Sequence, residues 1–159
     1  MPVLKSPPMD QLVETWQINN RIDLYLLDAI AEEHLVDALA SKGRDVGKQF
    51  AHIHNVRLMW LKAAAPDLNE KQTKLDDNIT KDFLKTRLTE SGLTIEELIT
   101  RSVANGGKVK GFKPHVTAFV GYLLAHDAHH RSQIILALKQ SGHKLEQKIG
   151  YGIWEWGSR

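Results

Sequence analysis

Three histidines stand within five positions of one stretch, His126, His129 and His130, in a segment that otherwise reads as an apolar helix, "LLAHDAHHRSQIILALK" at residues 123–139. The whole chain has only eight histidines in 159 residues. A helix advances by about 100° per residue, so His126 and His130 should share one face while His129 lies at its edge. The apolar residues on that face should form the buried stripe of the helix; they are Val116, Phe119, Leu123, Ile134 and Ala137.

Two histidines one helical turn apart can point at one shared atom, because their Cβ atoms are about 5–6 Å apart. Burying two imidazoles without partners would cost several kcal/mol, and a metal ion would satisfy both acceptors at once. The pair therefore indicates a metal site. The alternative is a pair of core histidines that bond through water and hold no metal.

A third ligand should come from another helix, and "FAHIHNVRLMW" at residues 50–60 offers His52 and His54. These two lie on opposite flanks of the apolar stripe of their helix, so at most one should join the site. Periodicity does not decide between them. The remaining histidines, His34, His115 and His143, fall near expected helix ends or loops, where we expect solvent exposure.

The elements that must position these side chains are all helical, since no alternating strand pattern occurs. We expect a single all-α domain over residues 1–159, an antiparallel four-helix bundle. The first helix should begin after Pro8 with Asp10 as its cap and run through residues 12–34, and the second should span 46–65 and end before Pro66. The third helical stretch should start near Thr80. Ser91-Gly92 interrupts it and Thr94 with Glu97 has capping-box spacing, so it should be either two short helices or one kinked helix. The fourth should run from Pro114 to about Ser141. The tail, residues 142–159, should pack back on the bundle, and its Tyr151, Trp154 and Trp156 should pack against other residues.

Composition narrows the class of protein. The absence of cysteine excludes disulfides, thiolate metal sites and a cysteine nucleophile, so a metal must be held by histidine, carboxylate or backbone oxygen. A net charge of +2 gives no argument for nucleic acid, and no apolar run is long enough to span a membrane. The start, "MPVLKSPPMDQ", shows no export signal, so we expect a cytoplasmic protein.

At these histidines the sequence resembles the DinB-like metal-binding family of bacterial four-helix proteins, through "RDVGKQFAHIHNVRLMWL", "LLAHDAHHRSQI" and the closing "YGIWEW". The resemblance implies a three-histidine site of His52, His126 and His130, and it is what selects His52 over His54. It also implies an up-down-down-up bundle, often a homodimer, with zinc or nickel whose shell is completed by water. Ser132 stands where the family often has glycine, which leaves the ligands untouched.

The chemistry stays open between three functions. Some members of that family are S-transferases or isomerases that use a low-molecular-weight thiol, which the resemblance implies as a possible second cofactor acting on a small-molecule substrate. Read as His126-Asp127-x-x-His130, the motif is also an analogue of the HExxH helix of zinc proteases, with Asp127 as general base of a hydrolase of small esters or amides. The third function is a non-catalytic stress-response module in which the metal braces the bundle or senses a ligand. Arg131 and Gln133 could contact a substrate, although rim packing is their default.

Overall fold

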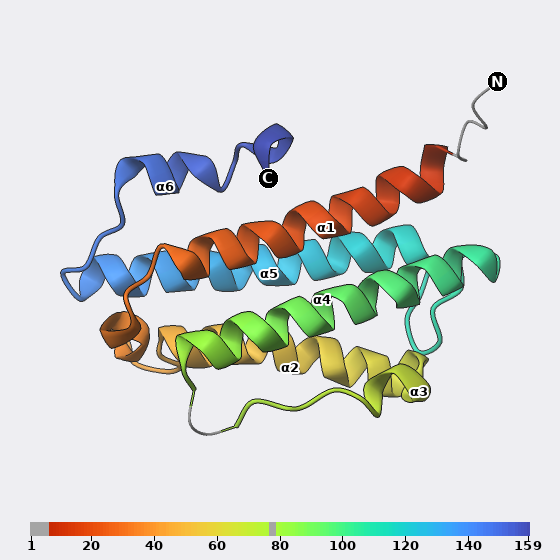
Figure 1. The fold of residues 1–159 in the computed structure, drawn as a ribbon, viewed down its shortest axis with the longest axis horizontal. Coiled ribbons are helices and arrows are strands. Elements are labelled where there is room, and N and C mark those ends of the chain that lie inside the picture. Colours follow the sequence, from red (N-terminus) through yellow and green to blue (C-terminus); the bar gives the residue numbers. More distant parts are fainter. Residues whose placement is uncertain (1–6, 77–78) are drawn as a thin grey trace.

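The computed structural model describes residues 7–76 and 79–159, and in these ranges the regular elements are helical except for one isolated β-bridge between Val109 and Phe112. Four long helices form the body of the molecule (Figure 1): α1 Pro7–Asp28, α2 Val46–Ala64, α4 Lys81–Ala104 and α5 Val116–Gln140. Four short elements complete it: η1 Glu32–Val36, α3 Pro66–Asn69, α6 Gln147–Gly152 and η2 Trp156–Ser158. The prediction of an all-α fold with four main helices is confirmed. None of the helices in the described ranges is both long and apolar enough to cross a bilayer.

Side-chain caps and a glycine turn set the helix ends that matter for the site. Asp45 accepts a hydrogen bond from the Lys48 amide at the start of α2, and the His115 ring accepts one from the Ala118 amide at the start of α5. At the end of α5, Gly142 adopts a φ of 83°, the left-handed conformation that glycine tolerates best. The bounds of α2 and α5 are therefore close to the predicted ones.

The predicted first helix is wrong at both ends. Helix α1 begins at Pro7, so Asp10 lies inside it, and α1 ends at Asp28 instead of continuing to His34. Residues Glu32–Val36 form a separate 3-10 helix instead, which turns the chain toward α2. The helical spacing of apolar residues continues across this short turn, and for this reason the sequence pattern did not reveal that the helix ends there.

Of the two alternatives for the third helical stretch, two short helices divided at Ser91-Gly92 is wrong, because α4 is one helix through both residues. Gly92 serves close packing instead. A Cβ at this position would collide with the side-chain amide of Asn20 on α1, and the indole Nε1 of Trp16 donates to the Gly92 carbonyl at 2.8 Å. The hydroxyl of Thr94 donates to the Glu90 carbonyl one turn earlier, so it is not a cap.

The interior has two apolar clusters with a polar layer between them along the bundle. One cluster gathers around Phe50 and Ile134, and the other around Trp16 and Phe119. The layer between them consists of buried polar side chains from all four long helices: Asn19, Asp23, His54, Arg57, Ser91, Asp127, His130 and Arg131. Burying so many polar groups costs free energy unless they pair with one another. Clusters of buried titratable groups of this kind are typical of functional sites.

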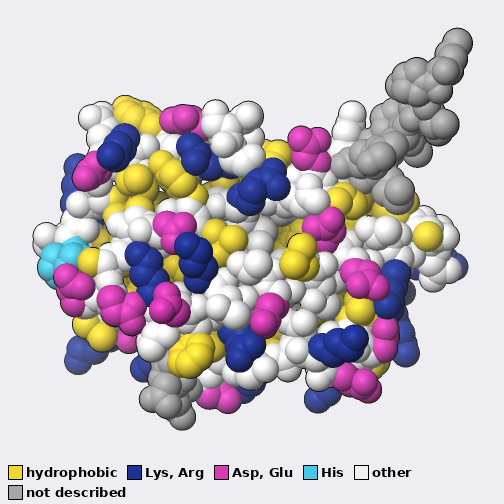
Figure 2. Space-filling view, in the orientation of Figure 1, with side chains coloured by type: hydrophobic (Ala, Val, Ile, Leu, Met, Phe, Trp, Pro, Cys, Tyr) yellow, Lys and Arg dark blue, Asp and Glu magenta, His cyan; other side chains and the backbone are white. Residues whose placement is uncertain are grey.

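The tail folds back beside α1 and α5 (Figure 1) and is fastened mainly at Tyr25. The guanidinium of Arg159 lies 3.9 Å from the centre of the Tyr25 ring, and a side chain at Gly152 would collide with the Tyr25 hydroxyl. Tyr151 and Trp154 nevertheless remain 63% and 74% exposed, so these side chains pack less closely than expected. Figure 2 shows hydrophobic side chains on the surface in the region of this tail.

Candidate metal centre

The structure brings together His52 on α2 with His126 and His130 on α5, beside the polar layer. Each of the three offers a ring nitrogen, and these atoms all lie within 4.8 Å of one another. The ring centroids are 4.5 to 5.3 Å apart in the three pairs. The two histidines of the i, i+4 pair and the one selected by resemblance thus form one cluster.

The spacing of the ring nitrogens fits a metal ion. Nε2 of His52 and Nε2 of His126 face each other at 3.4 Å, which is long for a hydrogen bond between nitrogens. Ligand nitrogens about 2.1 Å from a tetrahedral metal are about 3.4 Å apart. The donor set therefore fits a divalent transition metal without rearrangement of these two rings.

Gln49 fixes the orientation of His130. Its Oε1 lies 2.6 Å from His130 Nδ1, and because a carbonyl oxygen only accepts, Nδ1 carries the proton and donates it. The lone pair is then on Nε2, the atom left for a metal. Gln49 is buried and stands three residues before His52 on the same helix face, a spacing that could have identified it from the sequence.

The environment keeps two of the rings neutral. Burial, together with repulsion from His126 and His52, lowers the pKa of His130 to about 4. Burial lowers the pKa of His52 as well, assisted by the positive charge of Arg44 and by His126. Imidazole must be unprotonated to bind a metal, so both rings are ready to do so near neutral pH.

The two neighbouring histidines are outside the cluster for different reasons. His54 is fully buried, and both of its nitrogens have partners: Nδ1 lies 3.0 Å from the Ser91 hydroxyl and Nε2 lies 2.7 Å from the Thr73 carbonyl. His129 is exposed, with its ring edge-on to His130 at 5.0 Å. The choice between His52 and His54, which periodicity left open, thus has a structural reason.

Asp127 does not occupy the position of a general base, so that part of the hydrolase hypothesis is wrong. Its side chain is buried, and Oδ2 accepts hydrogen bonds from Asn19 at 2.8 Å and from Arg57 at 3.2 Å. Burial alone would raise the pKa of this carboxyl, but Arg57 and the hydrogen bonds from its neighbours hold it below its usual value. Oδ1 lies 3.5 Å from Nδ1 of His126. Asp127 therefore links the histidine to the polar layer and is turned away from any substrate on the open side.

Arg131 is likewise committed to the interior. It donates to Oδ1 of Asp23 at 2.6 Å and to Oδ1 of Asn19 at 2.9 Å, and only 8% of the residue is exposed. Asp23 also pairs with Arg57 at 2.9 Å. Two aspartates and two arginines thus pair behind the histidines, where burial and the neighbouring Asp127 raise the pKa of Asp23. The hydrogen bonds of Arg131 are made within this layer.

An aromatic cluster borders the site, which the sequence reading missed. The ring of Tyr122 stacks near His126 with centroids 6.5 Å apart, and Trp60 and Phe112 lie 5.6 and 5.5 Å from Tyr122. Tyr122 is one helical turn before His126, which is the signal that could have indicated it. Tyr122, Trp60 and Phe112 thus form an apolar wall beside His126, and the side chains of His126 and His52 are partly exposed.

Comparison with known proteins gives one assignment. No curated protein matches the chain at a significant level. The family model described as "DinB family" matches residues 1–152, which include all three histidines of the cluster. The chain belongs to the DinB family.

Proposed function

We propose that this protein binds a divalent metal ion, zinc or nickel, through His52, His126 and His130, and uses it in an S-transferase that works with a low-molecular-weight thiol. The observation that carries the proposal is the cluster of imidazoles at ligand spacing, with the pKa of His52 and His130 lowered. Three neutral nitrogen ligands from two helices leave room for a further ligand, as catalytic metal sites require.

The metal, when bound, would supply positive charge that lowers the pKa of a thiol placed beside it. The chain's own residues do the rest. Gln49 holds His130 in the tautomer with Nε2 free, while Asp127 lies against the opposite nitrogen of His126. Tyr122, Trp60 and Phe112 offer an apolar wall for the carbon skeleton of an electrophile. The chain has no cysteine, so the attacking sulfur comes from the small molecule.

The transfer is balanced without a redox partner. The thiol gives up its proton to solvent, its sulfur forms a bond to an electrophilic carbon, and the bond from that carbon to a halide or an epoxide oxygen breaks. The halide leaves as an anion, or the epoxide oxygen takes up a proton. This is nucleophilic substitution, and holding the two reactants in the right geometry contributes to its acceleration.

The test uses metal-loaded protein with a panel of low-molecular-weight thiols and either an epoxide or an alkyl halide, and measures the loss of free thiol. We expect a rate above that of the His130→Ala variant treated in the same way. Equal rates for the two proteins across the panel would overturn the transferase and favour the non-catalytic metal-binding module. Spectra of the cobalt-substituted protein that change on addition of thiol would support an open coordination position.

We also infer an up-down-down-up order of the four long helices. The connection between α2 and α4, residues 65–80, supports this order. In its described residues, 65–76 and 79–80, it contains only the short α3, and in Figure 1 the segment after α3 runs back along the bundle. A connection of this length allows α4 to run in the same direction as α2, which a tight turn would not.

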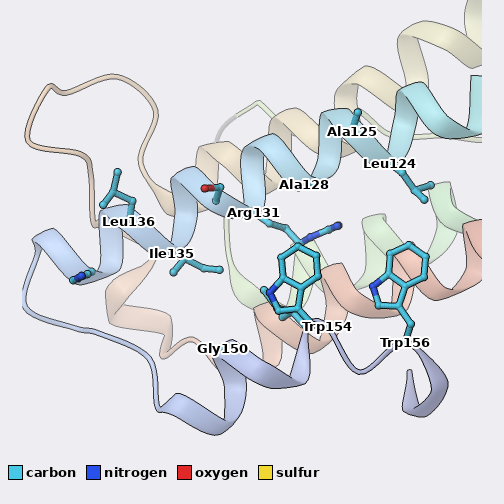
Figure 3. Close-up of a pocket in the computed structure, with 12 residues that line it drawn as sticks. Leu124, Ala125, Ala128, Arg131, Ile135, Leu136, Gly150, Trp154 and Trp156 are labelled. Carbon is cyan, nitrogen blue, oxygen red and sulfur yellow. The ribbon is translucent and has the colours of Figure 1, made fainter.

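We further propose that the protein forms a homodimer through the side of α5 that faces the tail. A cavity of about 680 Å³ opens there, lined by Ile153 of the tail and by Leu124 and Ile135 of α5. Figure 3 shows Trp154 and Trp156 reaching from the tail toward α5, and Leu136, which also lines the cavity, is 45% exposed. Exposed apolar patches of this kind mark interaction sites. The dimer would give twice the mass of the 18.0 kDa chain in sedimentation, and Trp154→Ser should shift it toward the monomer.

A further inference from the structure

A second cluster of metal-ligating side chains lies at the end of the bundle where η1 meets the C-terminal end of α5. It consists of His34, Asp37 and His143, whose ligand atoms also all lie within 4.8 Å of one another. The helix continues for ten residues from His130 to its end at Gln140, roughly 15 Å along its axis, so this cluster is separate from the first. Figure 2 shows histidine surface at this end of the molecule.

The three side chains are brought together from distant parts of the sequence. Nδ1 of His143 lies 2.6 Å from Oδ2 of Asp37, 106 positions away in the chain. The rings of His34 and His143 are stacked, with centroids 3.6 Å apart and planes 9° from parallel. The chain thus places two imidazoles and one carboxylate in mutual contact.

Closed backbone turns hold all three positions. The Asp37 amide donates to the His34 carbonyl at 3.1 Å, and the Asp37 carbonyl accepts from the Val46 amide at 2.8 Å. On the other side, the His143 amide donates to the Leu138 carbonyl at 2.8 Å, and the Gly142 amide donates to the Lys139 carbonyl at 3.2 Å. This is the Schellman pattern made possible by the positive φ of Gly142. Little backbone entropy is then left to lose when a ligand binds.

Two imidazoles and one carboxylate are a donor set that zinc and other divalent transition metals accept. The Asp37 carboxylate is only 8% exposed, and the hydrogen bond to His143 is the one described for its side chain, so it has lone pairs to offer. The 2.6 Å contact holds one hydrogen between nitrogen and oxygen. A metal ion that takes this place would bind both atoms and release the proton.

The cluster is accessible to an ion. The His143 side chain is 38% exposed, and a cavity of about 410 Å³ is lined by His34 and His143 together with Glu146, Lys144 and Lys148. The rings must turn out of their parallel stack, because the lone pairs of imidazole lie in the ring plane, and the exposed side gives them space. The two lysines repel a cation, so we expect weaker binding here than at His52, His126 and His130.

We propose that His34, Asp37 and His143 form a second site for a divalent transition metal, which ties η1 to the C-terminal end of α5. A bound ion would join the connection between α1 and α2 to the start of the tail. A bound ion would therefore reduce the mobility of the backbone at this end of the bundle. The proposal does not depend on the proposed transferase activity.

The experiment titrates Zn²⁺ into the His130→Ala variant, in which the first cluster is disabled, and follows binding by calorimetry. We expect about one equivalent to bind, and we expect it to be lost when His34→Ala or His143→Ala is added. The matched control adds His115→Asn, which removes an exposed histidine but keeps a side chain that caps α5, and should bind as before. Far-UV circular dichroism of each variant checks that it is folded.

Imidazole resonances in NMR spectra identify the ligands directly. We expect Zn²⁺ to shift the ring signals of His34 and His143 and to leave those of His115 unchanged. No binding by His130→Ala, or binding that survives the His34→Ala and His143→Ala changes, would overturn the second site. If only the first cluster fails to bind metal, the wild-type protein would bind one equivalent of Zn²⁺, and His143→Ala alone would abolish that binding.

Discussion

The two histidine clusters use similar side chains in different surroundings. His52, His126 and His130 lie against a buried polar layer, and Gln49 orients the ring of His130. His34 and His143 lie at an open end of the bundle, where the buried carboxylate of Asp37 is the partner of His143 and the ring of His34 stacks on that of His143. The difference teaches that the types of the ligand residues determine which metals can bind. The residues that surround the ligands determine the affinity for the metal and the orientation and protonation of the ligand rings.

Removing the charge that supports the first cluster should have the largest effect. Arg57→Ala would leave Asp23 and Asp127 buried without one of their two arginines, at a cost of about 3–5 kcal/mol in the free energy of unfolding. Urea unfolding followed by circular dichroism measures this. Arg87→Ala, which removes a partly exposed pair with Glu90, is the control and should cost no more than about 1 kcal/mol. Similar losses for both variants would show that the polar layer is not a supporting shell.

Removing a ligand should come next. His130→Ala should weaken Zn²⁺ binding at the first cluster by more than about 100-fold while leaving helix content largely unchanged, because the core on either side is mostly aliphatic. His129→Ala, which removes the adjacent exposed ring, should keep the metal. Calorimetry at equal protein concentrations compares them. Loss of metal in His129→Ala with retention in His52→Ala would contradict the ligand assignment.

Much of this comparison follows from the sequence, and the rest depends on contacts between distant segments. Periodicity was sufficient to place His126 and His130 on one face, because both belong to one regular helix. It could not separate His52 from His54, since the partners of His54 are Ser91 on α4 and the Thr73 carbonyl, neither of which is near it in the chain.

The same reason explains the wrong prediction for Asp127. Its inward orientation depends on Asn19 of α1 and Arg57 of α2, which only the folded bundle brings to it. Gly92 misled for a related reason, because a helical glycine can permit close helix packing as well as a break. The sequence did not indicate the second cluster, because His34 and His143 were expected to be exposed to solvent. That held for His143, whereas His34 is half-buried.

A smaller effect should follow from removing an orienting partner while keeping every ligand. Gln49→Leu would leave Nδ1 of His130 without its acceptor and free the ring to change tautomer, which should weaken Zn²⁺ binding by about 10- to 100-fold. Gln49→Glu keeps an acceptor at this position and should restore most of the affinity. If Gln49→Leu binds as well as the wild type, the orientation of His130 does not depend on this contact.

The smallest effect concerns acid and the metal-free protein. The pKa of His130 is lowered to about 4 in the folded state, whereas an unfolded histidine titrates near its ordinary value of about 6.5. Between these values the unfolded chain binds more protons than the folded one, so stability must fall as the pH drops through this window. From pH 7 to pH 5 we expect a loss of about 1–2 kcal/mol from His130, measured by urea unfolding in the presence of a chelator. His130→Gln should remove that part of the pH dependence, because glutamine does not titrate. Identical pH profiles for the two proteins would mean that His130 is not held neutral in the fold, and that the first cluster is no better prepared for a metal than an exposed histidine pair.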